Sequence, residues 1–226
     1  MSAYPVTYEA DYVEKRNRLS VFFRLVLVIP HAIVAYLVII GVFFTGIAAW
    51  FVVVATARYP QGLYDFNAKA TRWLARYYAY AYLEVDKFPP LGFDDSVAYP
   101  VNMRFAGPLP QYSRLKAFFR FLLIIPAVII LYALSIVLFF CTLAAWFVAV
   151  ITGKMPRGLH DALDFCLAYT FKACAYCLLL TETYPPFTNE SATLEPVDRP
   201  EALSATSGAF APPASAPVRD RSGLEG

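Results

Sequence analysis

Two long uncharged runs dominate the pattern of polar and apolar positions. Between Arg24 and Arg58, and again between Arg120 and Lys154, 33 consecutive residues contain no Asp, Glu, Lys or Arg. One straight helix of that length would be about 50 Å long, whereas the hydrocarbon core of a bilayer is about 30 Å thick. The pattern therefore predicts that each run crosses a membrane twice, as a helical hairpin that turns near residues 39–46.

A more polar segment follows each run. Residues 63–84 place Lys69, Arg72 and Arg76 on one helical face and apolar residues largely elsewhere, which is typical of an amphipathic helix lying in the membrane interface. The matching segment 162–181 is less polar and is open to a second interpretation as a third span. Three spans in each unit would make the two units inverted repeats, as in several transporters.

Short alternating segments precede each hairpin. The alternation in residues 6–12 and 101–105 predicts two extended stretches that pair outside the bilayer. The expected fold class is therefore an all-α integral membrane protein, built as a tandem repeat of a transmembrane helical hairpin followed by an amphipathic interfacial helix.

The repeat itself is visible without any gap. Residues 18–91 align with residues 114–187 at a constant offset of 96, and 29 of the 74 positions are identical. An N-terminal segment (1–17) and a linker (92–113) precede the two copies. The last segment, 188–226, has too few large apolar residues to offset chain entropy and is predicted to be a disordered tail.

Composition and charge agree with a membrane protein. The chain is 59% hydrophobic with a mean hydropathy of +0.51, and a net charge of +2 gives no reason to expect a nucleic-acid partner. In the hairpin topology the basic flanking residues fall on one side, which predicts that both termini are cytoplasmic. These residues are Arg16, Arg18, Arg58, Arg114, Lys116, Lys154 and Arg157.

The motif P-x-G-L-x-D closes both runs, at residues 60–65 and 156–161. We interpret it as a corner in which proline ends the preceding span and glycine permits the turn. The aspartate is expected in or before the first turn of the next helix, where an anion is favoured. The predicted corner residues are Pro60, Gly62, Pro156 and Gly158, followed by Asp65 and Asp161.

Arg24 and Arg120 recur at the same repeat position, at the edge of each apolar run. An arginine there must snorkel, bind a lipid phosphate or meet a carboxylate, and Asp65 and Asp161 are the expected partners. The candidates for headgroup binding or ion pairing are Arg24, Arg120, Asp65, Asp161, Lys69, Arg72 and Arg76.

No reactive group recurs with the motif. A repeated nucleophile or titratable pair would be needed for catalysis, and the two histidines are not repeat-related, so we assign no catalytic residue, metal or cofactor. The leading hypothesis is a non-enzymatic scaffold or accessory subunit whose partners are membrane lipids and possibly another membrane protein. The alternatives are a lipid-handling protein and a small transporter built from inverted repeats.

The stretches "NRLSVFFRLVLVIPH", "PQGLYDF" and "YPPF" together resemble the bacterial membrane family known only as domain of unknown function DUF4389, in two tandem copies. The first copy departs from the family pattern with Ala57 in place of glycine. The resemblance implies a multi-pass protein of the bacterial inner membrane and implies no reaction, cofactor or catalytic residue.

Overall fold

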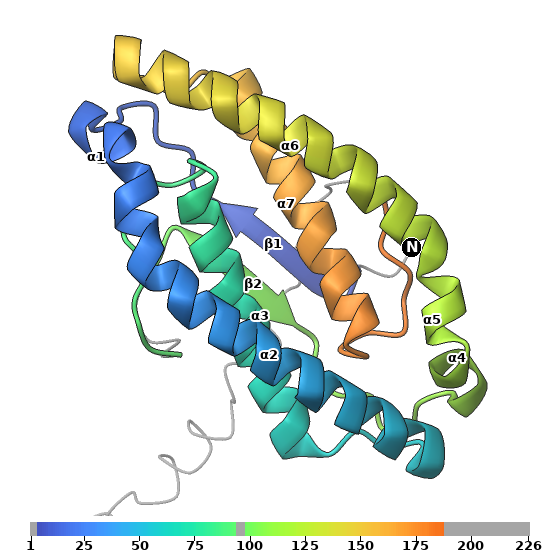
Figure 1. Ribbon diagram of the computed structural model, residues 1–226. Coiled ribbons are helices and arrows are strands. Elements are labelled where there is room, and N and C mark those ends of the chain that lie inside the picture. Colours follow the sequence, from blue (N-terminus) through green and yellow to red (C-terminus); the bar gives the residue numbers. More distant parts are fainter. Residues whose placement is uncertain (1–3, 94–97, 188–226) are drawn as a thin grey trace, which may run out of the picture. The chain divides into compact units, whose positions relative to one another are not determined.

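Helices carry most of the chain in the computed structural model, which describes residues 4–93 and 98–187 (Figure 1). The predicted tail, 188–226, lies outside the described residues. The elements are, in chain order, β1 (Val6–Ala10), α1 (Arg18–Phe22), α2 (Arg24–Thr56), α3 (Gln61–Ala81), β2 (Val101–Phe105), α4 (Arg114–Phe118), α5 (Arg120–Leu123), α6 (Ile125–Thr152) and α7 (Arg157–Cys177).

The predicted hairpin inside each apolar run is wrong, because α2 continues through residues 39–46 without a turn. This segment holds Gly41 and Gly46 but no proline or charged residue, and an unbroken helix satisfies every backbone group of an apolar stretch internally. Gly46 instead permits close packing, since a Cβ there would lie 2.9 Å from Leu178 Cδ2. Within residues 4–93 and 98–187, two helices, α2 and α6, are long and apolar enough to cross a membrane.

The chain reverses at the predicted corners, but the residue that makes the turn is not the predicted glycine. Ala57 ends α2 with φ 58° and Gly153 ends α6 with φ 71°, so the left-handed residue stands ahead of the motif. Pro60 and Pro156 are extended N-caps of the helices that follow.

The two motif glycines are not needed for the turn. Gly62 and Gly158 lie inside the first turns of α3 and α7, and a Cβ at either position would meet nothing within 4 Å. Asp65 and Asp161 lie beyond those first turns, so their predicted place at the helix start is also wrong.

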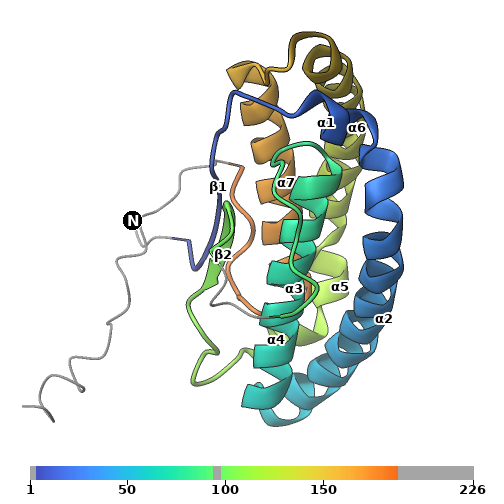
Figure 2. The same ribbon diagram turned by 90° about the vertical axis from the view of Figure 1, so that its left-hand side faces the viewer.

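The two extended stretches do pair, as predicted. β1 and β2 form an antiparallel two-stranded sheet in which Tyr8 faces Met103. The sheet packs on α3 and α7, and these pack in turn on α2 and α6 (Figure 2). The described residues therefore form three layers, with the two predicted interfacial helices in the middle and the long apolar helices on the outside.

The two repeats exchange their leading segments, which are β1 with α1 in the first copy and β2 with α4 in the second. α1 packs on α6 of the other copy and α4 packs on α2, while β1 packs on α7 and β2 on α3. The backbone N–H of Arg16 donates to Gly153 O at 2.9 Å, and Tyr112 N–H donates to Ala57 O at the same distance. Because α2 and α6 run in opposite directions (Figure 1), the copies are related by an approximate twofold axis.

The left-handed conformations of Ala57 and Gly153 predict that exchanging alanine and glycine at these two positions changes stability in opposite directions. Ala57→Gly relieves a conformation that costs an L-residue about 1–2 kcal/mol, partly offset by the entropy of glycine in the unfolded chain, and should raise stability by up to about 1 kcal/mol. Gly153→Ala adds the same strain and a Cβ at 2.9 Å from Arg18 Nε, and should lower stability by about 1–2 kcal/mol. Chemical unfolding in mild detergent measures both. Gly62→Ala is the control and should be neutral or slightly stabilising; a loss of stability in Ala57→Gly would contradict the assignment.

Candidate functional site

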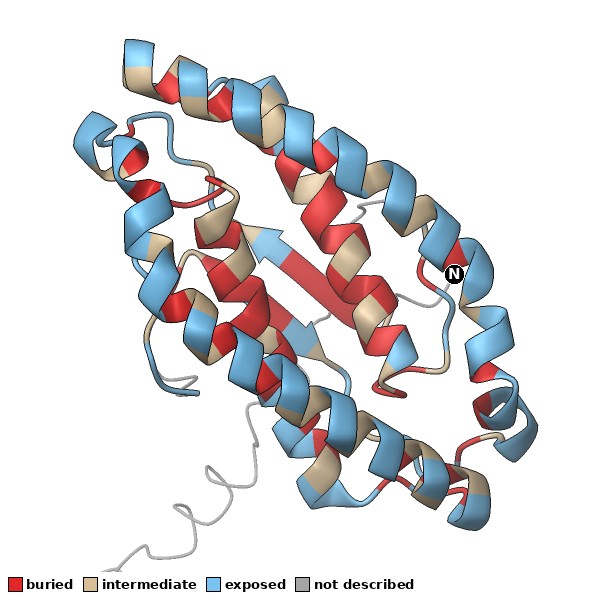
Figure 3. Cartoon of the chain, in the orientation of Figure 1, coloured by how far each residue is buried: buried red, intermediate tan, exposed pale blue. Residues whose placement is uncertain are grey.

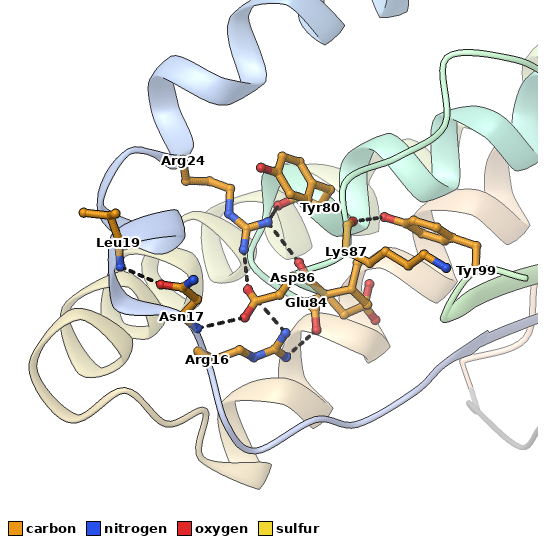
Figure 4. Close-up of polar contacts among 10 residues, drawn as sticks. Arg16, Asn17, Leu19, Arg24, Tyr80, Glu84, Asp86, Lys87 and Tyr99 are labelled. Carbon is orange, nitrogen blue, oxygen red and sulfur yellow. Dashed lines mark hydrogen bonds and ion pairs between the residues drawn. The ribbon is translucent and has the colours of Figure 1, made fainter.

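Arg24 is held in a buried polar pocket at the start of α2 (Figure 4). It is 2% exposed, and its Nη1 donates to Tyr80 O at 2.9 Å and to Val85 O at 3.0 Å. Its Nη2 lies 2.5 Å from Asp86 Oδ1, and its guanidinium stacks 4.0 Å from the Tyr80 ring centroid. The pocket forms because the chain after α3 returns to the N-terminus of α2, where Asp86 also accepts from Asn17 N–H at 3.3 Å.

The second copy repeats this pocket with weaker charge pairing. Arg120 Nη1 donates to Thr181 O at 3.2 Å, and its guanidinium lies 4.0 Å from the Tyr176 ring centroid. Glu182 stands at the position of Asp86 and accepts from Ser113 N–H at 2.7 Å, as Asp86 does from Asn17. The pocket is therefore a repeated structural device: it ties the end of each repeat to the start of the same repeat.

The residues predicted for headgroup binding or ion pairing do not gather in one place. Asp65 is exposed and accepts from Gln61 Nε2 at 2.9 Å, and Asp161 Oδ1 lies 3.7 Å from His160 Nδ1. The expected partnership of these aspartates with Arg24 and Arg120 is therefore not found.

The three basic residues of α3 differ in exposure. Lys69 is exposed, whereas Arg72 Nε donates to Met103 O at 2.7 Å and Arg76 is 3% exposed, with its guanidinium 5.7 Å from the Tyr99 ring centroid. Arg72 and Arg76 thus fasten the sheet to α3.

A buried carboxyl between the copies is not predicted by the repeat pattern, because it has no repeat counterpart. Glu84 is fully buried, and its Oε2 accepts from Tyr8 OH at 2.5 Å. Burial raises the pKa of Glu84 well above its ordinary value, and a hydrogen-bonded neighbour, Asp164, raises it further. The matching residue of the second copy is Leu180. That exchange of Leu for Glu was the signal available in the sequence.

Beside this carboxyl, Arg16 joins the first copy's pocket. Its Nη2 donates to Glu84 O at 2.6 Å, and its Nη1 lies 3.6 Å from Asp86 Oδ1. The aligned residue of the second copy is Tyr112, so the two pockets differ by a whole positive charge.

An apolar cavity of about 450 Å³ lies between the two copies. α2 and α6 form its walls, and α3 and α7 form its floor. Its lining includes Ile39, Val42, Thr71, Leu74, Tyr78 and Tyr82, together with the residues 96 positions later in each case. Because both copies contribute the same positions, the cavity lies on the approximate twofold axis.

The comparisons with known proteins identify the family. A family model described as "Domain of unknown function (DUF4389)" matches residues 18–92 and 114–189. The chain belongs to this family. Its two DUF4389 copies agree with the two structural repeats, and the searches of the curated proteins and of the solved structures found no match.

The Arg24 pocket predicts that substitutions of two aspartates change the free energy of unfolding by very different amounts. Asp86→Asn removes the carboxylate that faces two buried guanidinium groups and should lower the free energy of unfolding by about 2–4 kcal/mol. Asp65→Asn, on the exposed face of α3, should change it by less than about 0.5 kcal/mol. Denaturant unfolding of the DUF4389 protein in detergent measures both, and equal effects would contradict the pocket described above.

The buried carboxyl predicts a pH dependence with a defined sign. The raised pKa means that folded Glu84 keeps a proton that the unfolded chain releases above about pH 4.5, so stability falls as pH rises from there toward the raised pKa. Glu84→Gln mimics the protonated acid and should be more stable than the wild type at neutral pH, with a flatter profile. Thermal unfolding across pH 4 to 8 measures this. A Glu84→Gln variant that is less stable at pH 7 and keeps the wild-type slope would refute a protonated Glu84.

Proposed function

We propose that this chain is a lipid-handling protein of the bacterial inner membrane that lies in one leaflet, with α2 and α6 parallel to the membrane plane. The observation that carries the proposal is the exposed outer face of these two helices (Figure 3), whose exposed positions are mostly large apolar residues. Exposed members of this layer are Leu25, Ile33, Phe43 and Phe51 of α2, and Ile129, Phe139, Phe147 and Ile151 of α6.

Helix length supports an in-plane orientation. An unbroken α2 of 33 residues is about 50 Å long, which exceeds the hydrocarbon thickness by about 20 Å. Lying in the plane, the helix needs no tilt or local thickening of the bilayer to bury its apolar side chains.

The position of the sheet supports the same orientation. α3 runs back along α2, as the contacts of Tyr80 with Arg24 and of Asn67 with Thr45 indicate, and the strands lie beside the middle of α3, where Arg72 reaches Met103. If α2 crossed the bilayer, a two-stranded sheet with open edges would lie near the bilayer centre. Unpaired backbone groups at that depth are not tolerated facing lipid.

Charge at the same depth gives a third argument. Exposed polar side chains follow the sheet and its supporting helices, and each ionised group at the bilayer centre costs at least about 2.5–3.5 kcal/mol. They are Glu9, Asn102 and Arg104 on the strands and Lys69 near the middle of α3. The in-plane orientation keeps all of them in water.

Basic residues at both ends of the apolar layer fit an anionic membrane surface. At one end Lys15 lies beside Lys154, and Arg18 Nη2 donates to Thr152 O at 3.1 Å. At the other end Arg58 follows α2 next to α4, which carries Arg114 and Lys116. Each such cation near an anionic surface contributes about 1 kcal/mol to binding. With this orientation both termini and the linker stand on the cytoplasmic side.

A scaffold or accessory role is the second candidate. β1 and β2 each pair on only one side within the described residues, and such strand edges can accept a partner strand. A stoichiometric protein partner after purification in mild detergent would favour this role. The transporter alternative requires spanning repeats and a polar path, whereas the surface of the space between these repeats is mostly apolar and includes no charged side chain.

Spin-label depth measurements test the proposed orientation. In a chain whose four cysteines are replaced by alanine, single cysteines at Ile33 and Phe51 lie 18 residues apart on exposed positions of α2. An in-plane helix puts both labels at the same depth, and a spanning helix separates them by about 27 Å. Power saturation against oxygen and a water-soluble quencher measures the depth in vesicles.

The matched control is a label at Arg104 on β2, which should be accessible only to the water-soluble quencher. Equal depth at Ile33 and Phe51, within the hydrocarbon, is the expected result. A difference of 20 Å or more, or a label at Arg104 that lies in hydrocarbon, would overturn the in-plane proposal.

A further inference from the structure

The axial cavity has the chemistry of a binding site for one apolar chain. Its volume, about 450 Å³, falls within the usual range for small-molecule pockets. No Asp, Glu, Lys or Arg is among its lining residues, so a charged headgroup finds no partner there. Residues of α2 and α6 line the walls and residues of α3 and α7 line the floor, so the side of the cavity away from the floor lies between the two long helices.

A buried hydroxyl in the floor, that of Thr71, lacks a partner among the described residues. Thr71 is 2% exposed, and its Oγ1 makes no hydrogen bond. A buried hydroxyl without a partner costs about 1–3 kcal/mol, and a threonine in a helix normally satisfies itself on the preceding turn. Thr170, in the same cavity, does so by donating to Cys166 O at 2.7 Å. Among the described residues no group accepts a hydrogen bond from Thr71 Oγ1, so this donor is left over beside the cavity.

We propose that the cavity binds one neutral lipid that has a long hydrocarbon chain and a small uncharged end bearing a carbonyl oxygen, and that Thr71 Oγ1 donates to this oxygen. The source of the lipid rests on the proposed function. With α2 and α6 in the leaflet, the floor lies toward the headgroup side and the side away from the floor faces the hydrocarbon. A carbonyl at the floor and a chain leading out between the helices match the normal polarity of that leaflet.

The two threonines of the cavity, Thr71 and Thr170, provide a matched test with radiolabelled methyl oleate, whose ester has acceptor oxygens only. Thr71→Val keeps the shape of the side chain and removes the donor, and should weaken binding by about twofold to tenfold. Thr170→Val makes the same chemical change where the hydroxyl is already bonded, and should leave methyl oleate binding unchanged. Binding to purified protein in mild detergent is measured by scintillation proximity.

Filling the cavity tests the site independently of the hydrogen bond. Val42→Phe places a larger side chain in the wall and should reduce methyl oleate binding by more than tenfold, whereas Ile33→Phe on the outer face should not. Circular dichroism and size-exclusion chromatography establish that each variant is folded. Saturable binding that is equal in wild type and folded Val42→Phe would overturn the cavity as the site. Equal weakening by Thr71→Val and Thr170→Val would overturn Thr71 as the donor.

Mass spectrometry of an organic extract of the purified wild-type protein distinguishes the sources of such a lipid. An acyl ester or a quinone retained at about one per chain, and depleted in Val42→Phe, is expected; only charged phospholipids in both proteins would contradict the proposal. Because these measurements are made in detergent, they do not depend on how the protein lies in a membrane. A failure of the in-plane orientation would appear in the spin-label depths and leave methyl oleate binding intact.

Discussion

The exchange of leading segments between the two repeats is the constraint on which the rest of the structure depends. Arg16 and Tyr112 donate backbone hydrogen bonds to the left-handed corner of the opposite copy, at Gly153 and Ala57. The same exchange stacks Phe22 on Trp146 and Phe118 on Trp50, at centroid distances of 6.3 and 6.4 Å. Each copy therefore completes the other, and the antiparallel sheet, the axial cavity and the two-helix outer layer are products of the pair.

The repeat explains which parts of the arrangement the sequence could predict. Identical positions at an offset of 96 marked the corners and the arginines, and alternating residues marked the paired strands; these features are present in both copies. The number of helices in each apolar run could not be read in this way. An uncharged run of 33 residues is compatible with a hairpin or with one long helix, and the choice depends on whether α3 lies against the whole length of α2.

The acidic partners of Arg24 and Arg120 could not be predicted from the sequence pattern for a related reason. Asp65 was the nearest acidic residue in the motif, but the return of the chain after α3 brings Asp86 to Arg24 instead. That return is a consequence of tertiary packing at Leu83, which has φ 65°, and of the segment that follows it. The glycines were misread because glycine often marks a turn, whereas at these corners the strained position is occupied by Ala57 in one copy and by Gly153 in the other.

Positions at which the two copies differ add polar groups that have no symmetric counterpart. Glu84 replaces a leucine and Thr71 replaces another, so one copy contributes a buried acid at the sheet side and a donor in the cavity floor. The outer helices, in contrast, stay apolar in both copies, as the proposed contact with lipid requires. Shared positions thus form the apolar outer layer, whereas divergent positions supply the buried acid and the hydroxyl in the cavity floor.

The central claim is that the interleaved DUF4389 pair lies flat in one leaflet. Polarised infrared spectroscopy of the protein in oriented bilayers tests it most directly, because α2, α3, α6 and α7 run along one another and their amide signals add. The account predicts an amide I dichroism typical of helices parallel to the membrane plane. Dichroism typical of helices along the membrane normal would contradict it.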